Sequence, residues 1–334
     1  MEAIALVPIV EAAVLAPSVE NTQPWRFALH PGEAKTASID LFADRSRLLS
    51  VADPSGRELH ISCGAAIEFA RVAGRGLGLD CRVELLPDPA DEDHLARLVF
   101  EGEELPTATD LSLAQALPHR YTERGPFEDR VVPDGLVERL RQCVLPFEAW
   151  LKVLEPGADQ TTAAVLLGMA DEIASAWESY EAEAALWRRS EPGQTDGLPA
   201  YLEERKLAGR ASSFKLRGSH SSGPQSGLEE APPPAEHPLV AVIGTPGDEP
   251  YYWLQAGRAL GRLLVTAAAQ GVSASPMTQI LEIEPTRALL TRELRLVGRP
   301  QVLLRMGYAH GEPSAPRRPI EEVLIDAPDV PQAS

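Results

Sequence analysis

Several features are scarce in this chain of 334 residues, and each scarcity excludes a class of protein. The chain has only three cysteines, Cys63, Cys81 and Cys143, and no C-x-x-C pair, so neither a disulfide framework nor a zinc site is expected. No apolar run approaches the ~18 residues of a membrane span, and the N-terminus lacks the basic region of a signal peptide. We therefore expect a cytoplasmic protein with no membrane partner and no metal site.

Positive charge is also scarce, because 31 lysines and arginines face 49 acidic residues and leave a net charge of −18. Non-specific nucleic-acid binding depends on cationic side chains that neutralise phosphates, and a polybasic membrane patch needs the same charge. We expect no nucleic-acid partner. Lysine occurs at only four positions, so nearly all of the positive charge is arginine, which a general preference for arginine over lysine explains.

The common catalytic motifs are missing. The chain contains no G-x-x-x-x-G-K-[ST] phosphate loop and no H-E-x-x-H metal motif. Gly74, Gly76 and Gly78 lie where an expected helix ends, whereas a dinucleotide fingerprint opens one. Residues 218–223 do not give G-x-S-x-G, and the seven histidines are scattered. A self-contained hydrolase or a metalloenzyme therefore has little support.

What is present is a mixture of helical and strand-like patterns in two cycles. Helices are expected at 2–15, 56–79, 134–143, 158–189, 251–270 and 285–293. Strands are expected at 25–30, 37–43, 81–87, 95–100, 147–154, 238–244 and 300–308. Residues 190–236 have loop chemistry, which predicts a functional flap or a disordered segment. The small-residue helices 64–79 and 256–272 look alike, which indicates either an internal duplication or a chance match.

The segment 16–25, Ala-Pro-Ser-Val-Glu-Asn-Thr-Gln-Pro-Trp, joins an expected helix to an expected strand. Pro17 and Pro24 stiffen its two ends. Four side chains between them can donate or accept hydrogen bonds: Ser18, Asn21, Thr22 and Gln23. Such a rigid loop can read the edge of a flat polar heterocycle. The alternative is plain helix termination, in which Ser and Asn cap backbone groups and Pro breaks the helix.

The segment 119–127, His-Arg-Tyr-Thr-Glu-Arg-Gly-Pro-Phe, places Arg120, Thr122 and Arg124 two residues apart. On an extended chain these side chains face one side, so they can converge on one anion. Arginine suits phosphate because its donors are paired and charged. The alternative is surface ion pairing with the acidic neighbours Glu123, Glu128 and Asp129. A further cationic segment at 317–323 (Arg-Arg-Pro-Ile-Glu-Glu-Val) offers either a third donor to that anion or a solvated tail.

Together the three segments resemble one family, the FMN proteins of the nitroreductase fold. APSVENTQPWRF resembles their flavin-contacting segment, HRYTERGPF their R-x-[ST]-x-R-x-F phosphate segment, and RRPIEEVL their C-terminal phosphate-binding tail. The likeness is greater still to the single-chain, Acg-type FMN-binding proteins. Their pattern continues through residues 43–47, 53–58, 61–66 and 196–199, and it covers roughly residues 10–325.

The resemblance implies an α+β, nitroreductase-like fold of two fused halves, a pseudo-dimer with mixed sheets flanked by helices. The halves would be residues 1–112 and 113–330, with a flap insertion at about 190–236. No second R-x-[ST]-x-R precedes residue 16. The resemblance therefore implies one FMN per chain, and a monomer is possible because the pseudo-dimer lies within one chain.

The resemblance also implies the cofactor contacts. Those to the isoalloxazine ring would come from Pro17, Ser18, Asn21 and Gln23. Those to the phosphate would come from Arg120, Thr122, Arg124 and Arg318. Ser273 and Ala274 lie in the loop 271–277, which matches the family's loop over the flavin N5 side, and would offer backbone N–H groups. No catalytic side chain is assigned, since the flavin carries the chemistry. Tyr121, Glu20 and His119 are equally suited to proton handling and to structural roles.

The implied function is that of an FMN-binding oxidoreductase of the nitroreductase superfamily, with two-electron transfer through flavin N5. Its partners would be the flavin and a small-molecule substrate or electron donor. One alternative is an FMN storage or sequestration protein with a covered flavin and little or no NAD(P)H turnover. A second is an FMN-dependent oxidase or dehydrogenase in a biosynthetic pathway.

Overall fold

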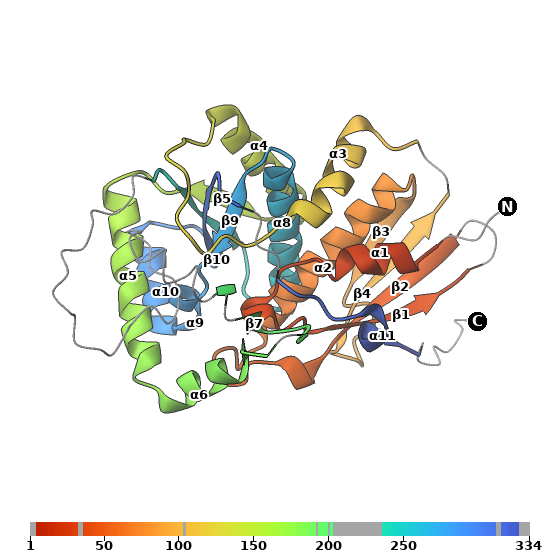
Figure 1. The fold of residues 1–334 in the computed structure, drawn as a ribbon, viewed down its shortest axis with the longest axis horizontal. Coiled ribbons are helices and arrows are strands. Elements are labelled where there is room, and N and C mark those ends of the chain that lie inside the picture. Colours follow the sequence, from red (N-terminus) through yellow and green to blue (C-terminus); the bar gives the residue numbers. More distant parts are fainter. Residues whose placement is uncertain are drawn as a thin grey trace.

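The computed structural model describes residues 5–32, 36–102, 105–191, 193–199, 201–202, 236–311 and 315–326. Within these residues, helices and strands are mixed along the chain, and the strands form two main sheets (Figure 1). The expected α+β class is therefore confirmed. Most of the expected flap at 190–236 lies outside the described residues.

The first sheet has five strands in the order β11-β1-β2-β4-β3. Their bounds are Trp25–His30 (β1), Thr36–Ala43 (β2), Asp80–Leu85 (β3), His94–Glu101 (β4) and Leu324–Ile325 (β11). Strands β1 to β4 pair antiparallel, whereas β11 pairs parallel with β1 through Phe27 and Leu324. Because β1 follows directly on the 16–25 loop, this pairing brings the C-terminal segment beside that loop.

The second sheet has four antiparallel strands in the order β5-β8-β10-β9. Their bounds are Trp150–Val153 (β5), Leu239–Thr245 (β8), Ser273–Pro276 (β9) and Arg299–Gly307 (β10). The edge strand β9 was expected to be a loop, but it pairs with the end of β10. An isolated bridge between Thr122 and Ala274 then lays the 119–127 segment along this edge.

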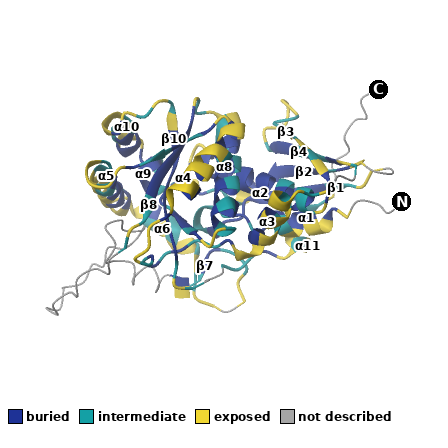
Figure 2. Ribbon diagram, turned by 90° about the horizontal axis from the view of Figure 1, so that it is seen from above, coloured by how far each residue is buried: buried dark blue, intermediate teal, exposed yellow. Residues whose placement is uncertain are grey.

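Two long helices, α2 (Arg57–Gly76) and α8 (Pro250–Ala268), pack against each other between the sheets (Figures 1 and 2). Two glycines allow the close approach. A Cβ atom on Gly64 would come within 2.9 Å of the Cα of Gly257, and one on Gly257 within 2.1 Å of the Ile61 carbonyl oxygen. These helices contain most of the two similar small-residue segments, 64–79 and 256–272. The two similar segments therefore pack against each other.

The remaining helices cover the sheets: α1 (Val7–Ala13), α3 (Ala108–Ala116), α4 (Asp134–Val144), α5 (Ala158–Ser175), α6 (Glu178–Leu186), α9 (Gln279–Glu282), α10 (Glu284–Glu293) and α11 (Ile320–Val323). Two very short strands, β6 (Arg188–Arg189) and β7 (Leu198–Pro199), form a separate pair. The expected single helix 158–189 is wrong, because Trp177 is extended and divides it into α5 and α6. Helix α3 was not expected, although Thr107 and Asp110 begin it with a capping box.

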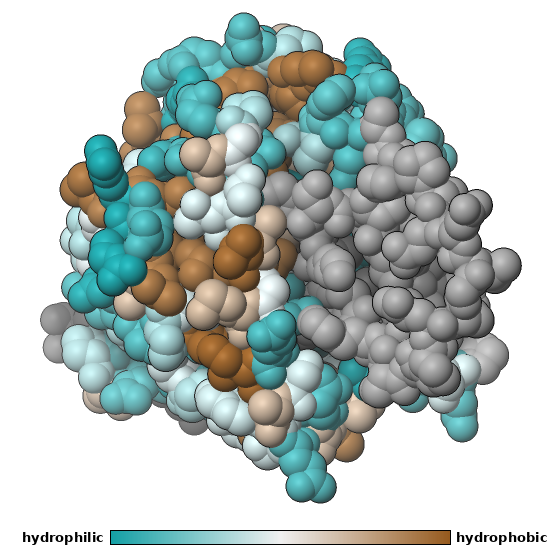
Figure 3. All heavy atoms as spheres, turned by 90° about the vertical axis from the view of Figure 1, so that its left-hand side faces the viewer, coloured by the Kyte–Doolittle hydropathy of each residue, from teal (hydrophilic) through white to brown (hydrophobic). Residues whose placement is uncertain are grey.

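None of the helices in the described part of the chain is long and apolar enough to cross a membrane. The face formed by α5 and α10 mixes hydrophobic and hydrophilic patches (Figure 3). On α5, Val165 and Met169 are exposed, while Leu166 and Ala170 turn into the core. Helix α5 is thus an amphipathic cover for the second sheet.

Candidate functional site

The loop at 16–25 holds an unusual backbone shape. Glu20, Asn21 and Gln23 have φ angles of 45°, 55° and 52°, a region that bulky L-residues rarely adopt. The Ser18 hydroxyl accepts a hydrogen bond of 2.9 Å from the backbone N–H of Gln23 and so closes the loop on itself. Strained backbone of this kind is retained where the surrounding structure fixes it, and it concentrates at functional sites.

The loop borders a cavity of about 110 Å³, called here the wide cavity. Its walls come from the 16–25 loop, α2, α8, β10, the 119–127 segment and the β9–α9 corner. The lining residues are Pro17, Ser18, Val19, Glu20, Glu58, Ile61, Ser62, Thr122, Arg124, Leu198, Leu260, Ser275, Pro276, Thr278, Gln279 and Val302.

A second cavity of about 80 Å³, called here the arginine cavity, adjoins the wide cavity. The two share four lining residues: Pro17, Ser18, Thr122 and Arg124. The arginine cavity adds Leu15, Asn21, Leu117, Pro118, Arg120, Tyr121, Ala315 and Arg317. Residues from the 16–25 loop, the 119–127 segment and the C-terminal segment thus surround two adjoining cavities.

The arginine cavity concentrates positive charge. Burial, followed by the charges of Arg317 and Arg124, lowers the pKa of Arg120 well below its usual value. Burial and the Arg124 charge likewise lower the pKa of Arg317 to about 10, so this side chain is still protonated at neutral pH. Like charges held together out of water are unfavourable. A bound anion would offset that repulsion.

The acidic residue within the 119–127 segment points away from the arginine cavity. The Glu123 carboxylate accepts a hydrogen bond of 2.6 Å from the Gly125 N–H. Burial lowers the pKa of Arg305, and the charges of Glu236 and Glu123 offset part of this shift. Arg120, in contrast, donates to the Leu15 carbonyl at 3.1 Å. Arg120, Thr122 and Arg124 therefore line the arginine cavity together with Tyr121, and Glu123 does not.

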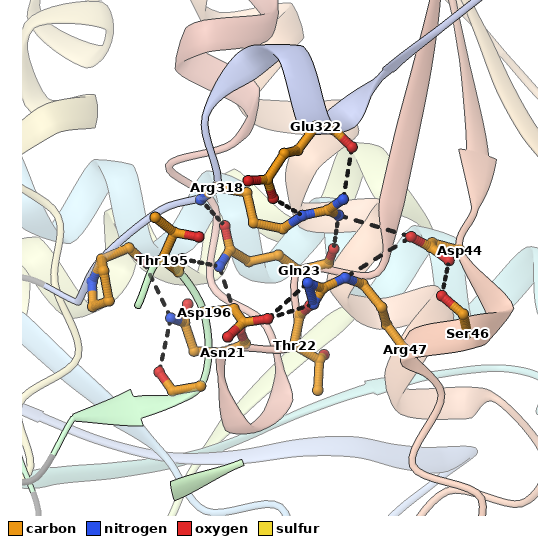
Figure 4. Close-up of polar contacts among 12 residues, drawn as sticks. Asn21, Thr22, Gln23, Asp44, Ser46, Arg47, Thr195, Asp196, Arg318 and Glu322 are labelled. Atoms are coloured by element: carbon orange, nitrogen blue, oxygen red, sulfur yellow. Dashed lines mark hydrogen bonds and ion pairs between the residues drawn. The ribbon is translucent and has the colours of Figure 1, made fainter. Parts of the chain in front are cut away.

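On the other side of the 16–25 loop, arginines and carboxylates form a dense network (Figure 4). The guanidinium of Arg318 donates to the Gln23 carbonyl at 3.2 Å and to the Glu322 carbonyl at 2.7 Å, and it lies 3.8 Å from the Asp44 carboxylate. The Gln23 side chain accepts from the Arg318 backbone N–H at 2.9 Å. Arg318 therefore supports the loop, while its neighbour Arg317 lines the arginine cavity.

The described part of the expected flap is tied to the same loop. Asp196 accepts two hydrogen bonds from Arg47, at 2.9 and 2.7 Å, and one from Arg189. The Asn21 amide donates to the Gly197 carbonyl at 3.0 Å, and the Gln23 amide donates to the Thr195 carbonyl at 2.9 Å. These contacts hold the chain so that Leu198 lines the wide cavity.

The sequence-predicted residues divide between lining and support. Both cavities are lined by Pro17, Ser18, Thr122 and Arg124, and the arginine cavity by Asn21 and Arg120 as well. Gln23 and Arg318 line neither cavity and instead brace the loop. Of the candidates for proton handling, Glu20 and Tyr121 line a cavity and His119 is exposed.

Ser273 and Ala274 line neither cavity, although Ala274 anchors the 119–127 segment by accepting a hydrogen bond from the Glu123 N–H at 3.0 Å. The lining residues of this part of the chain lie a few positions further on: Ser275, Pro276, Thr278 and Gln279. Arg317 was also missed. The Arg-Arg pair indicated a cationic contact, but nothing in the sequence tells which of two adjacent side chains turns inward.

Comparisons with known proteins give a consistent result. No family model matches the chain. A protein of Mycobacterium tuberculosis H37Rv with the provisional name NAD(P)H nitroreductase Rv3131 is 32% identical over 322 residues, which cover 95% of this chain and 90% of that protein. The protein Acg of the same strain, named in the same way, is 29% identical over 325 residues, with 94% and 93% coverage.

Solved structures give a weaker likeness. A nitroreductase with bound FMN from Desulfitobacterium hafniense is 10% identical, with a TM-score of 0.41, and the match covers 65% of this chain and 98% of that one. The FMN-dependent nitroreductase NfnB from Mycobacterium smegmatis, in complex with NADPH, is 17% identical with a TM-score of 0.40 and covers 65% and 100%. The family of this chain is therefore judged from the sequence relatives, because their matches span nearly the whole chain.

Proposed function

Since the chain belongs to the nitroreductase family that includes these mycobacterial proteins, we propose that it binds one FMN and acts as an oxidoreductase. The observation that carries this proposal is the pair of adjoining cavities, which share four lining residues. One end is wide and partly apolar, and the other gathers Arg120, Arg124 and Arg317. A flavin mononucleotide has the same division, with a flat ring system at one end and a phosphate at the other.

The charges of the arginine cavity fit the phosphate. By analogy with phosphorylated side chains, the group carries about two negative charges near neutral pH. Arg120 and Arg317 are destabilised mainly by burial and by neighbouring cations, so a dianion supplies what this cavity lacks. Thr122 lies between the two cavities and can donate its hydroxyl hydrogen to a phosphate oxygen.

The chain's own residues would bind, orient and shield the cofactor. The strained loop carrying Ser18 presents a fixed edge to the ring, with Gln23 and Arg318 holding its shape from behind. Ile61, Leu260 and Val302 exclude water from the ring's surroundings. Backbone N–H groups of the strand Ser273–Pro276 and the turn after it are suited to stabilise negative charge. Bound FMN supplies two-electron transfer through its N5 atom.

We also infer that the chain consists of two fused halves, 1–112 and 113–330. Two sheets on either side of the α2–α8 pair support this division, as does a site drawn from both parts of the chain. Strand β11 belongs to the second half of the chain but pairs with β1 of the first half, so the C-terminal segment joins the first sheet. The free thiols of Cys63, Cys81 and Cys143 fit a reducing cytoplasm.

The test is direct. Purified protein should be yellow, and the apoprotein should take up FMN in a one-to-one ratio and more tightly than riboflavin, which lacks the phosphate. Anaerobic mixing with NADH and NADPH should bleach the flavin, because the relatives' names point to these donors. Preference for FAD, or failure of any flavin to bind, would overturn the proposal. Binding without reduction by either donor would favour the storage protein over the enzyme.

A further inference from the structure

Two buried side chains in the wall of the wide cavity each have a polar atom without a hydrogen-bond partner among the described residues. Ser275 is 1% exposed and Gln279 is 3% exposed, and both line the cavity. The Ser275 hydroxyl and the Gln279 amide nitrogen find no hydrogen-bond partner among the described residues. Buried polar groups are nearly always hydrogen-bonded, so two orphans in one cavity wall need an explanation.

The two residues lie close together in the chain and line the same cavity. Ser275 lies in β9 and Gln279 begins α9, so both belong to the corner where the edge of the second sheet turns into a helix. The strained loop with Ser18 and Glu20 forms another wall of the same cavity. A ligand in the wide cavity would therefore meet polar side chains both from the N-terminal loop and from this corner.

Leaving these groups unpaired costs stability. A buried donor or acceptor without a partner loses its hydrogen bonds to water, which is a larger effect than the net gain of a typical hydrogen bond. Methionine in place of Gln279, or alanine in place of Ser275, would remove that cost and keep nearly the same shape. A chain that retains polar atoms there gains from them only when something else occupies the cavity.

We propose that Ser275 and Gln279 are ligand-reading residues, whose side chains hydrogen-bond the polar edge of the flat heterocycle held in the wide cavity. This inference rests on the proposed FMN function and adds the half of the recognition that comes from the β9–α9 corner. A serine hydroxyl and a primary amide both donate and accept, which suits the mixed carbonyl and ring-nitrogen edge of a flavin.

The proposal predicts that stability and binding change in opposite directions. Gln279→Met and Ser275→Ala apoproteins should melt at the same temperature as the parent or higher. Their dissociation constants for FMN should each rise roughly 3- to 10-fold, as the loss of one hydrogen bond implies. The absorption spectrum of the bound flavin should also shift, because hydrogen bonds to the ring edge alter its electronic environment.

Gln255→Met is the matched control. Gln255 is a buried glutamine of α8 that lines neither cavity and accepts a hydrogen bond of 3.0 Å from Arg258. This variant should melt at a lower temperature and bind FMN like the parent. If Gln279→Met and Ser275→Ala instead behave like the control, both side chains are structural and the inference is wrong. Failure of the parent apoprotein to bind FMN would remove the proposed function and this inference together.

Discussion

Two groups of arginines flank the 16–25 loop, and they differ in what surrounds them. At the arginine cavity, the charges that most affect Arg120 and Arg317 are those of other arginines. On the opposite side, Arg47 contacts the carboxylates of Asp196 and Asp44, and Arg318 those of Asp44 and Glu322.

The contrast separates binding from support. Arginines whose charge the protein itself compensates fix the loop and the chain around Asp196 (Figure 4). Arg120 and Arg317 donate to the Leu15 carbonyl, and Arg317 also to Asn21, yet burial and neighbouring cations lower the pKa of both, which favours a bound anion beside them. Arg317 and Arg318 are adjacent in sequence yet fall into different groups, because successive side chains of an extended segment point to opposite sides.

The strongest test of the contrast removes a cavity cation. Arg124→Met should raise the dissociation constant for FMN by about 10- to 100-fold, since a hydrogen bond to a charged group contributes roughly 1.5–3 kcal/mol. Titration of the variant and parent apoproteins with FMN measures the difference. Unchanged affinity would place Arg124 outside the phosphate contacts.

The adjacent pair gives the sharpest comparison. Arg317→Met should weaken FMN binding by about tenfold. Arg318→Met should instead reduce the free energy of unfolding by about 2 kcal/mol, because Asp44 and the carbonyls of Gln23 and Glu322 lose their donor. FMN titrations and urea unfolding of both apoproteins separate the two effects. If the two variants exchange these phenotypes, the division between binding and support is reversed.

A weaker effect is expected from the carboxylate that joins Arg47 and Arg189. Asp196→Asn should reduce the free energy of unfolding by about 1 kcal/mol, since the pair is partly buried and one Asp196 oxygen accepts two hydrogen bonds from Arg47. FMN affinity should fall less than in Arg317→Met. Asp93→Asn is the control, because its ion pair with Arg45 is exposed and should contribute almost nothing. Equal stability of the two variants would contradict the structural role of Asp196.

Two carboxyl groups, Asp248 and Asp53, show the same contrast between a charge with a partner and a charge that is mainly buried. Hydrogen bonds and ion pairing with Arg287 outweigh burial and lower the pKa of Asp248 to about 2. Burial raises the pKa of Asp53 to about 6, even though the Leu59 N–H donates to it. Asp248 therefore contributes stability that is present above its unfolded value of 3.8 and is lost as the pH falls toward 2.

The pH dependence of stability that Asp53 contributes has the opposite sign, because the folded state binds the Asp53 proton more tightly than the unfolded state does. Its contribution should decrease as the pH rises from about 4 to about 6, by on the order of 1 kcal/mol per pH unit at most. Asp53→Asn should remove this slope. Urea unfolding across that range checks it, and a slope that persists in the variant would assign it to other groups.

Much of the secondary structure follows from the sequence alone. Strand β1 runs over Trp25–His30, as expected from its apolar run, and α2 and α8 match their small-residue patterns within a few positions. The structure places Arg120, Thr122 and Arg124 around one cavity, although Tyr121 between them lines it too. These features depend on local periodicity, which the chain carries in its order of residues.

Other features depend on partners that are distant in sequence. Strand β9 forms because β10 offers a free edge, and β11 because β1 does. Helix α5 ends at Ser175, and α6 then anchors Tyr180 through a hydrogen bond of 2.8 Å to Glu282, more than a hundred residues away. Local propensity is too weak to specify pairings that tertiary contacts decide.

By itself, the sequence determined the α+β class, the three segments that meet at the site and the anionic character of the ligand they suit. Only the tertiary structure decided which side chains of those segments turn into the cavities. Arg317 rather than Arg318 lines the arginine cavity, and Ser275 and Gln279 rather than Ser273 and Ala274 line the wide one. For the arginine pair, the physical reason is that neighbouring side chains of an extended chain point to opposite sides. Ser273 and Ser275 share one face of β9, so their different places follow from where each pairs along β10. The direction itself is set by pairing with strands and loops elsewhere in the fold.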